Sequence, residues 1–218
     1  MSKITTPQKA IEIIESGSVL MIGGFLKGGH PETLVRELAT KKQISDLTVI
    51  SNDTGTTECS LYNVIKNKQV KKVIASYIGA NPETGKGLIT GEMEVELLPQ
   101  GTLAEKIRAG GAGLGGFLTP VGVGTIVEEG KEKITIDQKE YILELPLKAD
   151  IALVRAAKAD ENGNLVFKGS SRNFNAIMPL AAEHVIAEVE EIVPIGEIDP
   201  NEVDVPGILI DKIVKVGE

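Results

Sequence analysis

Two amide side chains stand directly after strand-like segments, where an amide could contact a substrate. Gln100 follows the segment 95–98, and its amide can donate a hydrogen bond to an oxygen that gains negative charge, without needing a shifted pKa. The same side chain could instead cap the turn before Gly101. Asn52 follows the apolar segment 47–50, and it could either orient a carboxylate or hold its own loop through an Asx turn. Both residues are therefore candidate site residues with a structural alternative.

Glycines follow another apolar segment, residues 19–22, and open the sequence Gly-Gly-Phe-Leu-Lys-Gly-Gly-His-Pro. Glycine lets a backbone turn sharply or approach a ligand closely. We expect Gly24 to offer a backbone donor and Phe25 to offer an apolar wall. Gly23 and Gly29 are further candidates for substrate binding. Packing alone is the alternative explanation for all four.

A second glycine run spans residues 110–116 and continues into Phe117 and Leu118, so that Gly-Gly-Phe-Leu occurs twice in the chain. The flanking residues differ, which indicates a local similarity and not an internal duplication. Gly115 and Gly116 are candidates for close contact with a partner chain or a ligand, and flexible-loop packing is the alternative.

Other reactive side chains lack the spacing that catalysis or metal binding needs. His30 and His184 lie far apart, with no Cys or carboxylate at metal-ligand spacing, so we expect structural or surface roles and no metal site. Cys59 has no nearby His and is interpreted as a bystander thiol. The alternating Glu residues of the segment 92–96 are typical of a solvated face.

Apolar segments alternate with helix-like segments through the first half of the chain. Strands are predicted at residues 19–22, 47–50, 73–75 and 95–98. Helices are predicted at residues 7–14, from Pro31 onward, at 61–65 and at 103–109, the last with Thr102 as its N-cap. This alternation implies right-handed crossovers and a mostly parallel sheet, in which ligands gather at the carboxyl ends of the strands.

The second half of the chain begins with a predicted β-hairpin, whose strands at 133–136 and 141–145 flank Asp137 to Glu140. Further elements are predicted as a strand at 151–154, a turn at 162–164, a helix at 175–182, a strand at 185–189 and a C-terminal strand at 208–210. The sequence therefore predicts an α/β fold: a single open, mostly parallel sheet flanked by helices, with a β-hairpin excursion.

Composition narrows the possible classes of function. The 218 residues suit one domain, 1–218, and no apolar run approaches the roughly 20 residues of a membrane span. A net charge of −8 argues against nucleic-acid binding, and the lysines at 71–72 and 131–133 are interpreted as solvated edges. A single cysteine and an N-terminus without an apolar signal core favour the cytoplasm.

The glycine stretch resembles the signature of the α subunit of family I coenzyme A transferases. Its matching positions are Gly23, Gly24, Phe25, Gly29 and Pro31, while Ser16 stands where the family has Asp or Asn. The similarity also covers the segments 50–54, 72–79, 81–85, 99–103, 110–120 and 172–175, and so nearly the whole chain. Ser60-Leu61-Tyr62 departs from the Gly-Ile-Gly of related short-chain acyl enzymes, and we expect these larger side chains to narrow the space beside the site.

This resemblance implies a function: the transfer of CoA between short-chain carboxylates such as acetate, butyrate and acetoacetate. The implied mechanism is ping-pong, through an acyl-glutamyl anhydride and a glutamyl-CoA thioester. In the family the nucleophilic Glu lies in the β subunit, within Ser-x-Gly-x-Glu-Asn-Gly, a motif that this chain lacks; the sequence at 160–164 reads as an acidic turn. Gln100 is then the expected oxyanion donor.

The resemblance also implies partners. A β subunit would complete the active site in a hetero-oligomer, α2β2 or larger, with the CoA thioester as a substrate and no bound cofactor. Two alternatives remain at this point. One is a sugar-phosphate isomerase or deaminase on a related fold, against which the lack of a nearby Lys and His/Asp base set speaks, and the other is a non-catalytic binding subunit.

Overall fold

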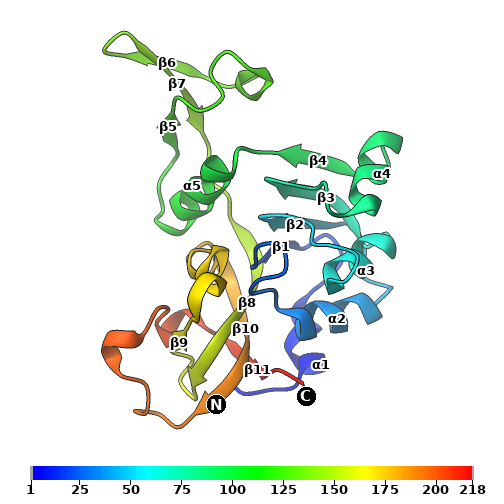
Figure 1. Cartoon of the computed structure of the whole chain (residues 1–218), viewed down its shortest axis with the longest axis vertical. Helices are drawn as coiled ribbons and strands as arrows, with labels where there is room; N and C mark the ends of the chain where they lie inside the picture. The colour runs from blue at the N-terminus through cyan, green and yellow to red at the C-terminus, as the bar shows by residue number, and fades with distance from the viewer. Residues whose placement is uncertain (1, 218) are drawn as a thin grey trace.

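In the computed structural model, which describes residues 2–217, the central sheet runs in the order β11-β10-β8-β1-β2-β3-β4, and all neighbouring pairs in this order are parallel (Figure 1). The strands are β1 (Val19–Ile22), β2 (Leu47–Ser51), β3 (Val70–Ala75), β4 (Glu94–Leu97), β8 (Ala149–Asp160), β10 (Ala182–Val193) and β11 (Lys212–Lys215). The chain builds outward from β1 in one direction and later returns to add β8 on its other side. The predicted open, mostly parallel α/β sheet is confirmed.

Side chains of β1 alternate between two cores, because successive residues of a strand point to opposite faces. Leu20 and Ile22 lie in the core beneath α1 (Pro7–Ala10), η1 (Ile11–Ile13), α2 (Glu32–Thr40) and α3 (Ser60–Lys66). Met21 lies in the second core, with Leu103 of α5 (Gln100–Gly111). The helix α4 (Pro82–Thr90) precedes the edge strand β4. No helix within residues 2–217 has the length and apolar character to cross a membrane.

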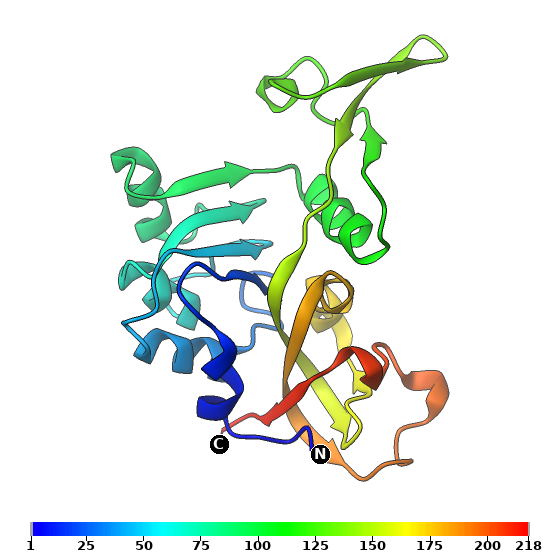
Figure 2. The ribbon, with the colours of Figure 1, turned by 180° about the vertical axis from the view of Figure 1, so that it is seen from behind.

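Three antiparallel strands stand away from the central sheet, as both ribbon views show (Figures 1 and 2). They pair in the order β5-β7-β6, with bounds β5 (Phe117–Thr119), β6 (Lys133–Ile136) and β7 (Lys139–Glu144). The short helix η2 (Ile126–Glu128) lies between β5 and β6 in the sequence. We call residues 117–144 the excursion. Its hairpin turn places Asp137 and Gln138 at φ +50° and +62°, as a type I′ turn requires, although neither is glycine.

Several predicted elements differ from the observed ones. Instead of a helix at 175–182, the chain forms the short turns η4 (Phe174–Ala176) and η5 (Met178–Leu180) before β10. The Asn175 side chain is engaged in tertiary hydrogen bonds and Pro179 lacks an N–H group, so a regular helix is not sustained. The remaining short elements are β9 (Leu165–Val166), η3 (Gly169–Arg172), η6 (Pro200–Glu202) and η7 (Gly207–Leu209).

Three further expectations are wrong in detail. Residues 208–210 are not the last strand, since η7 occupies this region and β11 follows it. Thr102 is not an N-cap, because α5 already begins at Gln100 and buries Thr102 in its first turn. Lys131 is not a solvated edge residue, because its ammonium pairs with the buried carboxylate of Glu144. The Asn162-Gly163 turn is confirmed and joins β8 to the antiparallel β9.

Candidate functional site

Asn52 lies at the centre of a polar cluster where β2, β3 and β4 end. Its Oδ1 atom accepts hydrogen bonds from Gln100 Nε2 at 2.7 Å and from Ser76 Oγ at 2.9 Å. The single hydroxyl hydrogen of Ser76 is shared between Asn52 Oδ1 and the Asn52 backbone oxygen, which lies 2.8 Å from Ser76 Oγ. Asn52 is only 2% exposed. The structure therefore brings together the two amides that the sequence analysis marked, with Asn52 buried and Gln100 exposed.

Asp53 links this cluster to the glycine turn. Its Oδ2 atom accepts from Asn52 Nδ2 and from the backbone N–H of Leu26, both at 2.8 Å. Its Oδ1 atom accepts from the Gly55 N–H at 2.9 Å. Because the side chain is buried, water does not compete for these bonds. The sequence reasoning missed Asp53, although its place directly after Asn52 at a strand end was a usable signal.

Gln100 is exposed and is the first residue of α5, which follows Pro99. Among residues 2–217 its side chain makes the single hydrogen bond to Asn52. Since a primary amide carries two N–H groups and an acceptor oxygen, one donor and the oxygen are left for another molecule. This arrangement suits the stabilisation of a developing negative charge. Its role as an oxyanion donor stays a prediction.

The first glycine turn is shaped by side chains from elsewhere. A Cβ atom on Gly23 would lie 1.9 Å from Asn175 Oδ1, and one on Gly24 would lie 2.7 Å from the His30 ring. Gly24 also has φ +121°, where only glycine is comfortable. Gly29 has φ +74° and would meet Asn175 Nδ2 at 2.9 Å. Close packing therefore requires these three glycines, and a contact with substrate stays a prediction for each.

Phe25 forms a tight turn with Gly28, through paired backbone hydrogen bonds of 2.9 and 2.8 Å. The turn leaves the Phe25 side chain 43% exposed, beside the exposed side chain of Leu26. Tyr77, whose N–H donates to the Asn52 oxygen, is 49% exposed. Aromatic surface is thus available on two of the loops around Asn52.

Asn175 ties the glycine turn to β8. Its side-chain oxygen accepts from the Arg155 N–H at 2.9 Å, and its Nδ2 atom donates to the Gly29 and Ser171 oxygens, both at 2.9 Å. Asn175 is fully buried. The sequence reasoning assigned it to a helix, and the segment 172–175 was marked only by its resemblance to the transferase family. Its contacts with Gly29 span most of the chain, so no local pattern reveals them.

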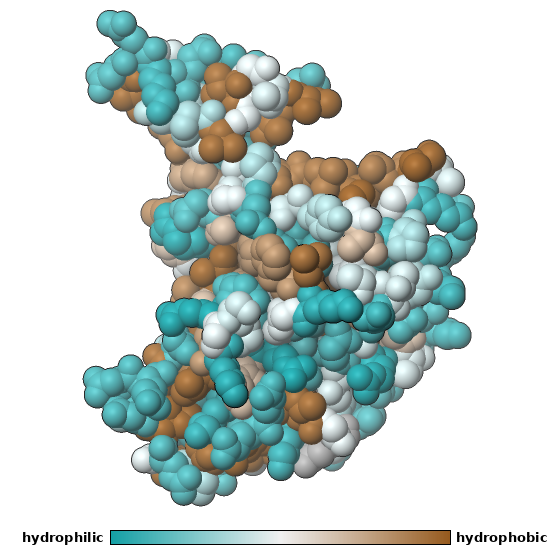
Figure 3. Space-filling model, in the orientation of Figure 1, coloured by the Kyte–Doolittle hydropathy of each residue, from teal (hydrophilic) through white to brown (hydrophobic). Residues whose placement is uncertain are grey.

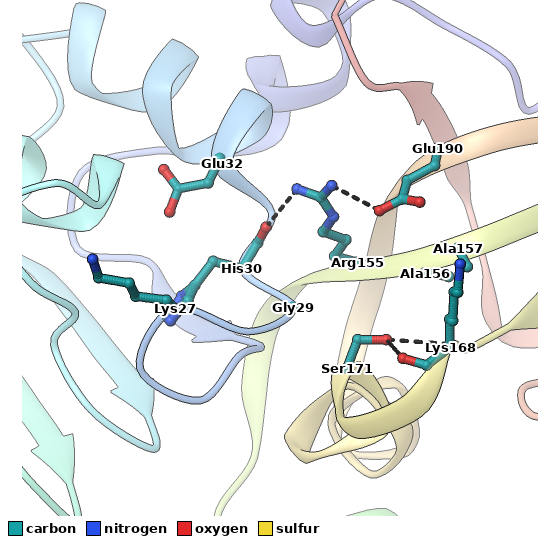
Figure 4. A pocket seen from close by; sticks show the side chains of 10 residues that line it. All are labelled: Lys27, Gly29, His30, Glu32, Arg155, Ala156, Ala157, Lys168, Ser171 and Glu190. Atoms are coloured by element: carbon teal, nitrogen blue, oxygen red, sulfur yellow. Dashed lines mark hydrogen bonds and ion pairs between the residues drawn. The ribbon is translucent and has the colours of Figure 1, made fainter.

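A cleft of about 260 Å³ lies behind the glycine turn, between Lys27, His30, Arg155, Lys168 and Glu190 (Figure 4). The Arg155 guanidinium donates to Glu190 Oε1 at 2.9 Å, to the His30 oxygen at 3.4 Å and to Glu188 Oε1 at 3.5 Å. The Arg155 guanidinium, which lies at the centre of the cleft, is therefore already bound by acceptors of the protein itself. The cleft therefore reinforces the turn, and we do not assign it a substrate.

Glu188 is fully buried beneath this cleft and anchors the next helix. Its Oε2 atom accepts from the N–H groups of Thr33 and Leu34, at 2.6 and 3.1 Å, in the first turn of α2. Burial raises the pKa of the Glu188 carboxyl above its ordinary value of 4.5, while the two backbone N–H groups and the Arg155 guanidinium oppose that shift. The carboxylate sits at the positive end of a helix, which favours its charged form.

Gly115 and Gly116 are not part of the Gln100 cluster. They follow the opposite end of α5, roughly 16 Å along a helix that rises 1.5 Å per residue. A Cβ atom on Gly115 would meet no atom within 4 Å, whereas one on Gly116 would lie 2.8 Å from the Glu144 oxygen. Glu144 is buried between Lys106, at 3.0 Å, and Lys131. A contact of Gly115 and Gly116 with a partner chain or with CoA stays a prediction.

The remaining marked residues have ordinary surroundings. Cys59 is buried at the start of α3, and exposed His184 lies 3.5 Å from Asp211. Leu61 is 1% exposed and packs in the core beneath α3, whereas Tyr62 is half-buried. That the two narrow the space beside the site stays a prediction. Glu94 and Glu96 pair with Lys72 on the β4 edge. Within the described residues no three His, Cys, Asp or Glu side chains form a metal-binding group.

Comparison with known proteins places this chain in a family. The coenzyme A transferase family matches residues 4–216. The chain is 50% identical over 213 residues to the acetate CoA-transferase subunit alpha of Escherichia coli K12, covering 98% of this chain and 96% of that protein. It is 49% identical over 214 residues to the acetoacetyl-CoA:acetate/butyrate CoA transferase alpha subunit of Clostridium acetobutylicum, covering 98% of each.

The fold is also shared with a solved structure. An acyl-CoA transferase from Escherichia coli O157:H7, solved as a thioester complex with CoA, matches with a TM-score of 0.89 at 22% identity. The match covers 98% of this chain but 47% of that longer chain, so this chain shares the fold of about half of that protein. On the family match and the two close relatives, the chain belongs to the coenzyme A transferase family, as a chain of the α-subunit type.

Proposed function

We propose that this chain is the α subunit of a short-chain acyl-CoA:carboxylate CoA-transferase and that Gln100 donates a hydrogen bond to the oxyanion of the reaction. The carrying observation is that an exposed amide is held on a buried one, Asn52, at 2.7 Å, with a second N–H left over. A donor fixed before the reaction stabilises charge without reorganising at the moment of attack.

The chemical steps need a carboxylate nucleophile, which we assign to a glutamate of a partner subunit. This carboxylate attacks the acyl-CoA carbonyl, the C–S bond breaks, and CoA leaves as a thiolate, which gives a mixed anhydride. The thiolate then attacks the glutamyl carbonyl, the anhydride C–O bond breaks, and the first acid is released, leaving a glutamyl-CoA thioester. The acceptor acid reverses these steps, so no redox reagent is consumed.

Each tetrahedral intermediate carries an oxyanion, to which the second N–H of Gln100 would donate a hydrogen bond. Phe25 and Tyr77, both partly exposed near Asn52, would contact the acyl chain. The names of the two close relatives support acetate, butyrate and acetoacetate as the acids. Coenzyme A enters as the thioester substrate and not as a bound cofactor. Transfer is also favoured over sugar-phosphate isomerisation or a purely binding role by the family assignment.

The exposed surface near Gln100 is suited to a covering partner. Figure 3 shows apolar surface on both sides of the hollow between the excursion and the β4 edge of the central sheet. Leu97 at the end of β4 is 50% exposed, and Leu145 at the base of the excursion is 60% exposed. Apolar surface of this kind marks contacts between chains. We assign the partner as a β subunit in a cytoplasmic hetero-oligomer, α2β2 or larger.

The test compares the chain alone with the chain produced together with its partner subunit. Exchange of CoA between acetoacetyl-CoA and acetate should require both chains. After incubation with acyl-CoA, a borohydride-sensitive thioester should form on the partner and not on this chain. Formation of that thioester on the isolated chain would overturn the division of labour proposed here.

A further inference from the structure

We propose that Asp53 is a positioning residue that determines which end of the Gln100 amide meets the substrate, and that it acts through Asn52. The role rests on the proposed function of Gln100 and deepens it. Asp53 does not touch Gln100; the two side chains are joined by the Asn52 amide, through bonds of 2.8 and 2.7 Å.

The polarity of the two amides follows from the carboxylate. A carboxylate oxygen accepts hydrogen bonds, whereas an amide has a donor at one end and an acceptor at the other. Asp53 Oδ2 therefore binds the Nδ2 end of Asn52 and turns Asn52 Oδ1 toward Gln100. Asn52 Oδ1 in turn binds the Nε2 end of Gln100. The remaining N–H on Gln100 Nε2 is the donor that the reaction needs.

The other neighbour of Asn52 cannot set this polarity. Ser76 Oγ lies 2.9 Å from Asn52 Oδ1, and a hydroxyl donates or accepts equally well. Ser76 would therefore serve a flipped Asn52 amide by rotating its hydrogen. Asp53 has one polarity only, and it is itself held by the backbone N–H groups of Leu26 and Gly55.

Asp53 also connects Gln100 to the glycine turn. The same oxygen, Oδ2, binds Asn52 Nδ2 and the Leu26 N–H. Leu26 has φ +49°, a conformation that non-glycine residues adopt when the surroundings enforce it. The glycine turn thus holds the carboxylate in place, and the carboxylate orients Gln100 through the Asn52 amide.

The test is Asp53→Asn in the assembled enzyme. An asparagine offers one acceptor oxygen for three N–H donors at two positions, so the direction of the Asn52 amide is no longer determined. Gln100 can then turn its Oε1 atom inward and misdirect its donor. We expect kcat to fall about 10-fold to 100-fold, less than the roughly 100-fold to 1,000-fold typical of a deleted oxyanion donor, with KM nearly unchanged.

A double-mutant cycle separates this role from a general loss of structure. Added to Gln100→Ala, Asp53→Asn should lower kcat by less than about 2-fold, because its effect passes through the missing side chain. Asp160→Asn is the matched control: Asp160 is also buried and binds the N–H and Nδ2 of Asn164, at 2.9 and 2.7 Å, in the β8–β9 turn. It should lower the melting temperature and leave kcat unchanged.

The outcomes are distinguishable. Wild-type kcat in Asp53→Asn, or the same fold loss with and without Gln100, overturns the role of Asp53 while the oxyanion role of Gln100 stands. An unchanged kcat in Gln100→Ala overturns both. If Asp53→Asn does not assemble, Asp53→Ser is measured in the same cycle with the same expectations, since a hydroxyl can donate or accept and does not fix the direction of the Asn52 amide.

Discussion

Gly-Gly-Phe-Leu occurs twice in this chain, and the two copies have different surroundings. At the first copy, a Cβ atom on Gly23 would lie 1.9 Å from Asn175 Oδ1, and the Gly23 N–H donates to the Leu153 oxygen at 2.9 Å. At the second copy, a Cβ atom on Gly115 would meet nothing within 4 Å, and one on Gly116 would meet the backbone oxygen of Glu144, in the neighbouring strand β7, at 2.8 Å. Side chains from distant segments, and not the tetrapeptide itself, give the first copy its fixed shape beside the proposed site.

A buried carboxylate lies near each glycine run, and the two carboxylates differ in the groups that bind them. Glu188 accepts from the backbone of α2 and pairs with Arg155 below the first run. Glu144, beside Gly116, pairs with the side chains of Lys106 and Lys131. The carboxylate near the first run is therefore held by backbone N–H groups of α2, whereas the one near the second run is held by lysine side chains. The second run joins α5 to the excursion. We infer that the first is the rigid component of the site.

The largest difference between the runs should appear on adding a methyl group. Gly23→Ala should lower the free energy of unfolding by about 3 kcal/mol, because the new Cβ atom overlaps Asn175, which is buried and fully bonded. Gly115→Ala is the matched control and should change it by less than about 0.5 kcal/mol. Chemical denaturation of both variants measures these values. Similar losses in the two variants would contradict the comparison.

A smaller effect is expected from the titration of Glu188. Because burial raises its pKa in the folded chain above 4.5, the folded state binds more protons than the unfolded state just above that pH. Stability from this group is therefore greatest at low pH and falls as pH rises from about 4.5 through the raised pKa. The slope is at most about 1.4 kcal/mol per pH unit for one proton.

Glu188→Gln removes this titration. Melting temperatures of the wild type and the variant are measured from pH 4 to pH 7. As pH rises, the wild type should lose stability relative to the variant, with the slope expected for the release of one proton. Parallel curves for the two proteins would show that Glu188 does not titrate differently in the folded and unfolded chains.

The parts of the fold that local pattern determines were predictable. The apolar segments at 19–22 and 47–50 match β1 and β2, because central parallel strands are buried on both faces. The prediction failed where tertiary contacts override local preference. Asn175 and Pro179 lie in a helix-like segment, but Asn175 bonds to Gly29 and Arg155, so short turns form instead.

The site was predictable to the same degree. Gln100 and Asn52 were marked because each carries an amide after a predicted strand, where ligands gather in a parallel sheet. That the two side chains bind each other, with Gln100 Nε2 2.7 Å from Asn52 Oδ1, was not predicted. Asp53 and Glu188 were not marked, since their roles depend on backbone N–H groups of Leu26 and Thr33 that are remote in sequence. Gly115 and Gly116 were grouped with the site by their residue type, and the structure places them at the other end of α5.

The central claim is tested most directly by kcat of Gln100→Ala, assembled with its partner subunit. Removal of the amide leaves Asn52 Oδ1 its bond from Ser76, so the melting temperature should change little. We expect kcat to fall about 100-fold to 1,000-fold, or roughly 3 to 4 kcal/mol, with CoA binding nearly retained.

Gln8→Ala is the control, since Gln8 also lies in the first turn of a helix and donates to one side chain, Glu37, at 3.3 Å. It should leave kcat unchanged. A Gln100→Ala enzyme that melts at a lower temperature yet turns over at the wild-type rate would contradict the account and place Gln100 among the structural residues.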